Sequence, residues 1–142
     1  MNAKEFLEQA TVLNEKINMD FLHRQKLKEL LEQISGGSVA LHERVQGGQL
    51  PDSPASKLVD KITDLDRLIE QELAEYDTVM EQIKEAIAYC KNQDEMKVLK
   101  KIYLEGKEIA DAVIELNIPK STIYTLHNRA IKKIDSFLAE QN

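Results

Sequence analysis

The sequence predicts an all-α protein made of a long N-terminal antiparallel helical hairpin, coiled-coil-like, and a C-terminal three-helix helix-turn-helix module. Three observations predict this class. Apolar residues recur at steps of three and four along two long stretches. Most glycines and prolines fall between these stretches, so residues 35–56 are predicted to be a linker. A short amphipathic segment, a turn and a basic segment follow near the C-terminus. We therefore expect two domains, residues 1–91 and 92–142.

The first long stretch, residues 2–34, is predicted to form one helix. Its apolar stripe consists of Phe6, Ala10, Leu13, Ile17, Phe21, Leu27, Leu31 and Ile34. At 1.5 Å per residue, such a helix is about 50 Å long. A single helix of this length cannot bury its stripe against itself, and so it needs a partner helix.

The second long stretch, residues 54–91, is predicted to form that partner. Ser53 is placed to cap the helix, and Pro54 suits its first position. The apolar stripe runs from Leu58 to Cys90 in heptad steps, with one extra residue near Leu73 that locally unwinds a supercoil. The matching stripes favour a hairpin. We expect the hairpin also to form a homodimer, because long seams leave apolar surface for a second copy.

The C-terminal part, from Gln93 to Leu138, is predicted to contain three helices with a sharp turn between the last two. Its middle helix carries Ile109, Ala112, Val113 and Leu116 at the spacing of a helix packed on one side. Asn117 tolerates the left-handed conformation that ends a helix, and Pro119 suits the first turn of the next one. Two helices joined by such a turn, the second of them basic, are typical of a helix-turn-helix.

The last helix, Lys120 to Ile134, separates its residues onto two sides. Its apolar side consists of Ile123, Leu126, His127, Ala130 and Ile134, and no acid occurs in the segment. A polar side with amide, hydroxyl and cationic groups suits the DNA major groove, where cations meet phosphates and Asn, Arg and Ser reach base edges. A solvated amphipathic helix is the alternative interpretation. The predicted DNA-binding residues are Lys107, Lys120, Ser121, Thr122, Tyr124, Thr125, Asn128, Arg129, Lys132 and Lys133.

The charge of the chain is unevenly distributed. The net charge of the 142 residues is −6. Residues 1–90 hold 10 Lys/Arg and 17 Asp/Glu, whereas residues 91–142 hold 9 and 8. The acidic character therefore belongs to the N-terminal part, and DNA binding by the weakly basic C-terminal module should be modest and sensitive to salt.

Several segments of the C-terminal part resemble region four of the bacterial sigma factors, the helical module that reads the −35 promoter element. These segments are 103–106, 116–124 and 129–130. The whole chain resembles a family of small phage and prophage proteins, the sigma-like or ArpU-type regulators of late or lytic genes, which share the segment 43–46. The resemblance implies double-stranded DNA as a partner and allows RNA polymerase as another. Two positions depart from the pattern: Val113 is bulkier than usual, and Pro119 replaces a capping Ser or Thr.

The sequence shows no pattern that predicts catalysis, a metal site or a cofactor. Cys90 lies on an apolar stripe and is expected to be a core residue, and the three histidines lack metal-ligand spacing. We expect a cytoplasmic protein that is neither an enzyme nor membrane-spanning. Two alternatives to a transcriptional regulator stay open. One is a DNA-packaging protein like the phage small terminase subunit, and the other is an RNA polymerase-binding adaptor that does not contact DNA.

Overall fold

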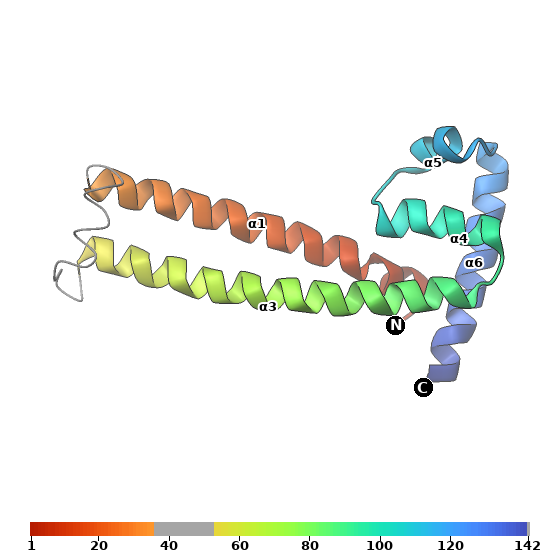
Figure 1. Ribbon diagram of the computed structural model, residues 1–142, viewed down its shortest axis with the longest axis horizontal. Helices are drawn as coiled ribbons and strands as arrows, with labels where there is room; N and C mark the ends of the chain where they lie inside the picture. The colour runs from red at the N-terminus through yellow and green to blue at the C-terminus, as the bar shows by residue number, and fades with distance from the viewer. Residues whose placement is uncertain (36–52, 142) are drawn as a thin grey trace. The chain divides into compact units, whose positions relative to one another are not determined.

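The computed structural model describes residues 1–35 and 53–141. These residues contain helices and no strand, which confirms the all-α class. Most of the predicted linker, including the segment 43–46 and His42, lies outside the described residues. The elements, shown in Figure 1, are α1 (Ala3–Ser35), α3 (Pro54–Tyr89), α4 (Gln93–Leu99), the π-helix η1 (Lys100–Leu104), α5 (Ile109–Leu116) and α6 (Lys120–Gln141).

The chain divides into two compact units. One unit comprises Glu15–Ala74, and the other comprises Met1–Asn14 together with Glu75–Asn142. These divisions pass through α1 and α3, and so they do not coincide with the predicted domains 1–91 and 92–142. Each unit is described by itself below, as the helical unit (15–74) and the C-terminal unit (1–14 and 75–142).

The helical unit pairs a segment of α1 with a segment of α3. Leu27 and Leu31 of α1 form one apolar cluster with Ala55 and Ile62 of α3. Lys16 lies 3.5 Å from the Glu72 carboxylate. Arg24 forms an ion pair with Asp66. Residue numbers rise along one helix as they fall along the other, so the two segments are antiparallel.

The start of α3 is capped as the sequence predicts. The Ser53 hydroxyl oxygen accepts a hydrogen bond of 3.1 Å from the backbone N–H of Ser56. Pro54 is the first helical residue. Because proline has no N–H to donate, it is well tolerated where the helix has no acceptor for one.

Three predicted stripe residues are exposed. Phe21 is 46% exposed, Ile34 is 45% exposed and Leu73 is 43% exposed. Phe21 and Leu73 each follow a step of four residues, which turns the side chain about 40° past the previous stripe position. In place of Leu73, the helical unit buries its neighbour Glu72, which is 3% exposed. Burial and the nearby Asp20 carboxylate raise the pKa of Glu72.

The C-terminal unit has its main core where α6 meets the N-terminal end of α1 and the C-terminal end of α3. Leu7, Ile83, Leu99 and Ile134 are fully buried members of this cluster. Cys90 belongs to it as predicted, and burial raises the pKa of its thiol. The cysteine therefore acts as a small core residue.

The second long helix ends at Tyr89, two residues before the predicted end. Lys91 adopts a left-handed conformation with φ of 63°, which interrupts the helix. Asn92 then caps α4, because its side-chain oxygen accepts a hydrogen bond of 3.0 Å from the backbone N–H of Glu95. The second long helix therefore ends close to the predicted end at residue 91.

The first helix of the predicted three-helix module is not a uniform α-helix. It changes at Lys100 into the π-helix η1, in which the backbone N–H of Glu105 donates to the carbonyl oxygen of Lys100 at 2.9 Å. Gly106 follows with φ of +68°, a conformation that glycine adopts without steric cost. None of the described helices combines the length and the apolar character that crossing a membrane requires.

Candidate nucleic-acid interface

The turn between α5 and α6 has the conformation that the sequence predicts. Asn117 is left-handed, with φ of 54° and ψ of 46°. The backbone N–H of Ile118 then donates to the carbonyl oxygen of Val113 at 3.3 Å, and the N–H of Ile123 donates to that of Pro119 at 3.0 Å. The chain therefore leaves α5 and starts α6 within three residues, from Asn117 to Pro119.

We expect Asn117→Ala to destabilise the protein and Asn117→Gly to be tolerated. A left-handed residue with a Cβ costs roughly 1–2 kcal/mol, whereas Asn bonds locally and Gly has no Cβ. The free energy of unfolding of the two variants, measured by urea denaturation, checks this. Equal stability of the alanine and glycine variants would show that this conformation is not what holds the turn.

The apolar side of α6 is buried as predicted. Ile123 and Leu126 pack in a second cluster with Val98 of α4 and Ala112 of α5. Val113 also contacts this cluster and is half-buried, so its bulk is accommodated between the helices. Because α6 is held from this side by two helices, its opposite side is fixed as the outer one.

The outer side of α6 is exposed to solvent. None of the residues predicted to contact DNA is buried. They carry two kinds of group, cations and neutral hydrogen-bonding groups. Tyr124 is 44% exposed, and the Lys120 ammonium lies 6.0 Å from its ring centroid. The exposed residues that the sequence predicted as DNA contacts are Lys107, Lys120, Ser121, Thr122, Tyr124, Thr125, Asn128, Arg129 and Lys132.

Lys133 differs from the other predicted contacts because its ammonium has partners inside the protein. Its ammonium lies 2.5 Å from the carboxylate of Glu95, which is 2% exposed, and also donates to the carbonyl oxygen of Cys90 at 3.2 Å. The ammonium is therefore paired with a buried acid, while 42% of the Lys133 side chain stays exposed. The spacing contains the signal for this, because Lys133 follows the buried Leu126 by seven residues and so lies on the same side of the helix.

His127 lies on the inner side of α6, as predicted, and contacts η1. Its Nε2 is 2.7 Å from the hydroxyl oxygen of Tyr103, and the two rings are stacked with centroids 5.7 Å apart. Burial lowers the pKa of His127. Burial also raises the pKa of Tyr103 to about 12, with a smaller contribution from Glu8. Both groups are thus neutral near pH 7. Their contact links α6 to η1.

Asp135, the first acid after the basic segment, also has a partner inside the protein. Asp135 accepts a hydrogen bond of 2.8 Å from the backbone N–H of Ala3, at the start of α1. A carboxylate at a helix N-terminus is stabilised by the free N–H groups there. Sequence reasoning did not identify this contact, which joins residues 132 positions apart.

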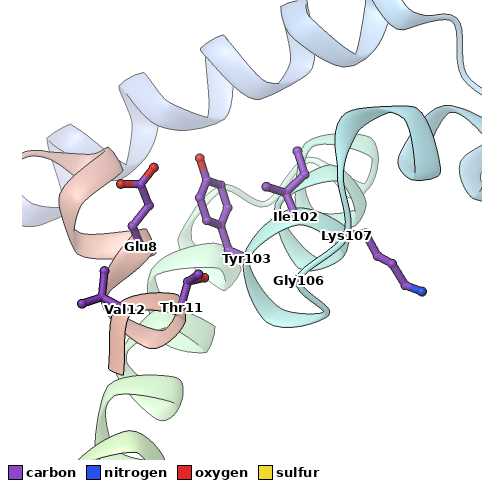
Figure 2. Close-up of a pocket in the computed structure, with 7 residues that line it drawn as sticks. All are labelled: Glu8, Thr11, Val12, Ile102, Tyr103, Gly106 and Lys107. Atoms are coloured by element: carbon purple, nitrogen blue, oxygen red, sulfur yellow. The ribbon is translucent and has the colours of Figure 1, made fainter. Parts of the chain in front are cut away.

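Lys107 lies apart from α6, beside a cavity of about 330 Å³. Figure 2 shows its side chain directed away from the other residues that line the cavity, so its ammonium is presented to solvent. The remaining lining residues are Glu8, Thr11, Val12, Ile102, Tyr103 and Gly106. Among the described residues, no group of His, Cys, Asp and Glu side chains is arranged to hold a metal ion.

The structure thus defines an all-α protein whose last helix is anchored on one side and presents an exposed polar surface on the other, with no acid between Lys120 and Ile134. The chain belongs to the DUF1492 family, described as proteins of unknown function, whose family model matches residues 33–135. This match spans α3, α4, η1, α5 and most of α6. Searches of the curated proteins and of the solved structures find no match.

Proposed function

We propose that the protein is a DNA-binding transcriptional regulator that acts in the cytoplasm. Its interface would be the outer side of α6 together with Lys107. The observation that supports this proposal is the exposure of Ser121, Thr125, Asn128 and Lys132 on a helix whose opposite side is buried. The proposed activity is DNA binding, without catalysis.

Within this proposal the exposed cations and the neutral groups have different tasks. Lys107, Lys120 and Lys132 contact phosphates, which contributes affinity and positions the helix. Arg129 and Asn128 face base edges in the major groove, where Arg pairs with guanine and Asn with adenine. Ser121, Thr125 and Tyr124 complete this surface, with Thr122 at its edge.

The biological setting of the proposal rests on the resemblance to sigma-like phage regulators. We propose that the protein is phage-derived, controls late or lytic genes, and acts as a homodimer through its N-terminal helices. Two copies of a helix-turn-helix module in one dimer read two half-sites. RNA polymerase is the second partner that the resemblance allows.

A second candidate function is an adaptor that binds RNA polymerase and does not contact DNA. The outer side of α5 favours this candidate. Ile114 is 78% exposed there, and the acids Asp111 and Glu115 are exposed beside it. In many helix-turn-helix proteins the first helix crosses the DNA backbone, where acids oppose phosphates. An apolar residue flanked by acids instead suits a protein surface that carries cations.

Titration of a random-sequence duplex at low and moderate salt separates the two candidates. Regulators that contact phosphates bind such a duplex, and their affinity falls as salt rises. Binding with this salt dependence is the expected result. Absence of binding at low salt, with the protein folded, would favour the adaptor.

A further inference from the structure

The helical unit concentrates the exposed apolar side chains of the described residues. Eleven large hydrophobic side chains are exposed in residues 1–35 and 53–141, and seven of them lie in residues 15–74. A pair of helices has only one seam to bury, whereas these residues lie outside that seam. They are Met19, Phe21, Leu22, Leu30, Ile34, Leu68 and Leu73.

Some of these side chains form one face, which can be traced from the Lys16–Glu72 ion pair. Along α1, Met19 follows Lys16 by three residues and Leu30 follows it by two full heptads, so both lie on the same side as Lys16. Along α3, Leu68 and Leu65 precede Glu72 by four and seven residues. Because Lys16 and Glu72 contact each other, the exposed Met19, Leu30 and Leu68 share one face of the helical unit. The half-buried Leu65, which packs against the seam cluster, borders this face. We call it the Met19 face.

The same face has an unbalanced group of charges at one end. Glu72 is 3% exposed, and neither of its carboxylate oxygens has a hydrogen-bond partner. One oxygen of Asp20 is likewise buried without a partner. Lys16 is the one cation within 4 Å of Glu72 among the described residues, and the Asp20 carboxylate beside Glu72 has no ion pair there. At the other end of the face, Lys61 is exposed.

We propose that a second copy of this chain covers the Met19 face across a two-fold axis, so that each helix lies antiparallel to its own counterpart. In a two-fold contact, residues equidistant from the axis meet. An axis level with Arg24 on α1 brings Met19 opposite Leu30 of the second copy. The Arg24–Asp66 ion pair sets the corresponding level on α3 just beside Asp66.

This register also pairs the residues of α3. Leu65 comes opposite Leu68 of the second copy, and Lys61 comes opposite Glu72. The apolar residues therefore meet apolar residues at the centre. At each end, the Lys61 ammonium of one copy faces Asp20 and Glu72 of the other copy, the two carboxylates that lack enough cations within their own chain. On both helices, the residues that pair lie at equal distances on either side of the proposed axis. A second copy of this chain matches this arrangement automatically, whereas a different protein would not, and so we take a second copy as the partner.

The inference deepens the homodimer part of the proposed function, but its test uses no DNA. The native mass of the full chain, measured by sedimentation equilibrium at micromolar concentration, should correspond to two chains. Met19→Glu/Leu30→Glu should reduce it to one chain with unchanged helical content by circular dichroism. Asn18→Glu, a control next to Met19 on the outer side of α1, should remain dimeric. A monomeric or ring-sized wild-type protein would overturn the inference, as would a dimer that the double variant leaves intact.

Cross-linking tests the register itself and does not depend on the folding of the glutamate variant. A chain with Met19→Cys/Leu30→Cys should oxidise to a covalent dimer, because each introduced thiol meets its counterpart across the axis. Either single variant should not, since its two cysteines are then about 16 Å apart along the helices, beyond the reach of a disulfide. The native Cys90 is buried and has a raised pKa, so it does not interfere. Equal cross-linking of single and double variants would overturn this register.

Discussion

The double variant Arg129→Ala/Lys132→Ala is expected to bind a random DNA duplex at least roughly tenfold more weakly than the wild type at low salt. Each cation removed from a phosphate contact reduces the steepness of log affinity against log salt by about one. Lys132 is the phosphate contact of the two, so the slope should become less steep by about one, whereas the loss of Arg129 removes a contact to a base edge. Both side chains are exposed, so the thermal midpoint should not change. Fluorescence anisotropy at several salt concentrations measures both the affinity and the slope.

Lys28→Ala is the matched control for this prediction. Lys28 is also exposed, but it belongs to the helical unit and lies outside the proposed interface. Its replacement changes the net charge of the chain by one and should leave the affinity unchanged. If the double variant bound as tightly as the wild type, the outer side of α6 would not be the DNA-binding surface.

Replacing Lys133, the neighbour of Lys132, should affect stability. Lys133→Ala is expected to lower the free energy of unfolding by about 3 kcal/mol, because it leaves the buried Glu95 carboxylate without its cation. Urea denaturation measures this loss. Lys132→Ala should change the same quantity by no more than about 0.5 kcal/mol.

Removing the charge of Glu95 as well tests the cause. In Lys133→Ala/Glu95→Gln no unpaired carboxylate is left in the core, so much of the lost stability should return. The Cys90 carbonyl, the other acceptor of Lys133, is unaffected by the second change. A Lys133→Ala variant as stable as the wild type would mean that the Glu95 pair contributes nothing, and would return Lys133 to the candidate DNA contacts.

Local patterns were sufficient to predict the elements that depend on short-range geometry. The apolar side of α6, the left-handed Asn117 and the Ser53 cap all follow from spacing or from the conformational preferences of single residues. The cap and the turn need only neighbours within a few positions. Side-chain spacing alone also fixes which side of α6 is buried.

The remaining features depend on contacts between distant residues. The partners in the Lys133–Glu95 pair are 38 positions apart, and those in the Tyr103–His127 contact are 24 apart. No local pattern pairs them. The stripe was misleading at Leu73, because a step of four residues shifts the side chain to the edge of the seam. The buried position then falls to Glu72, a residue whose type predicts exposure.

Titration of the 142-residue chain with a random-sequence duplex tests the central claim most directly, namely that the outer side of α6 engages DNA. With Lys133 committed to Glu95, three lysines remain for phosphates: Lys107, Lys120 and Lys132. At slightly less than one unit per contact, log affinity should fall against log salt with a slope of about −3 for each bound copy. A folded protein that does not bind, or whose affinity is independent of salt, would contradict the account.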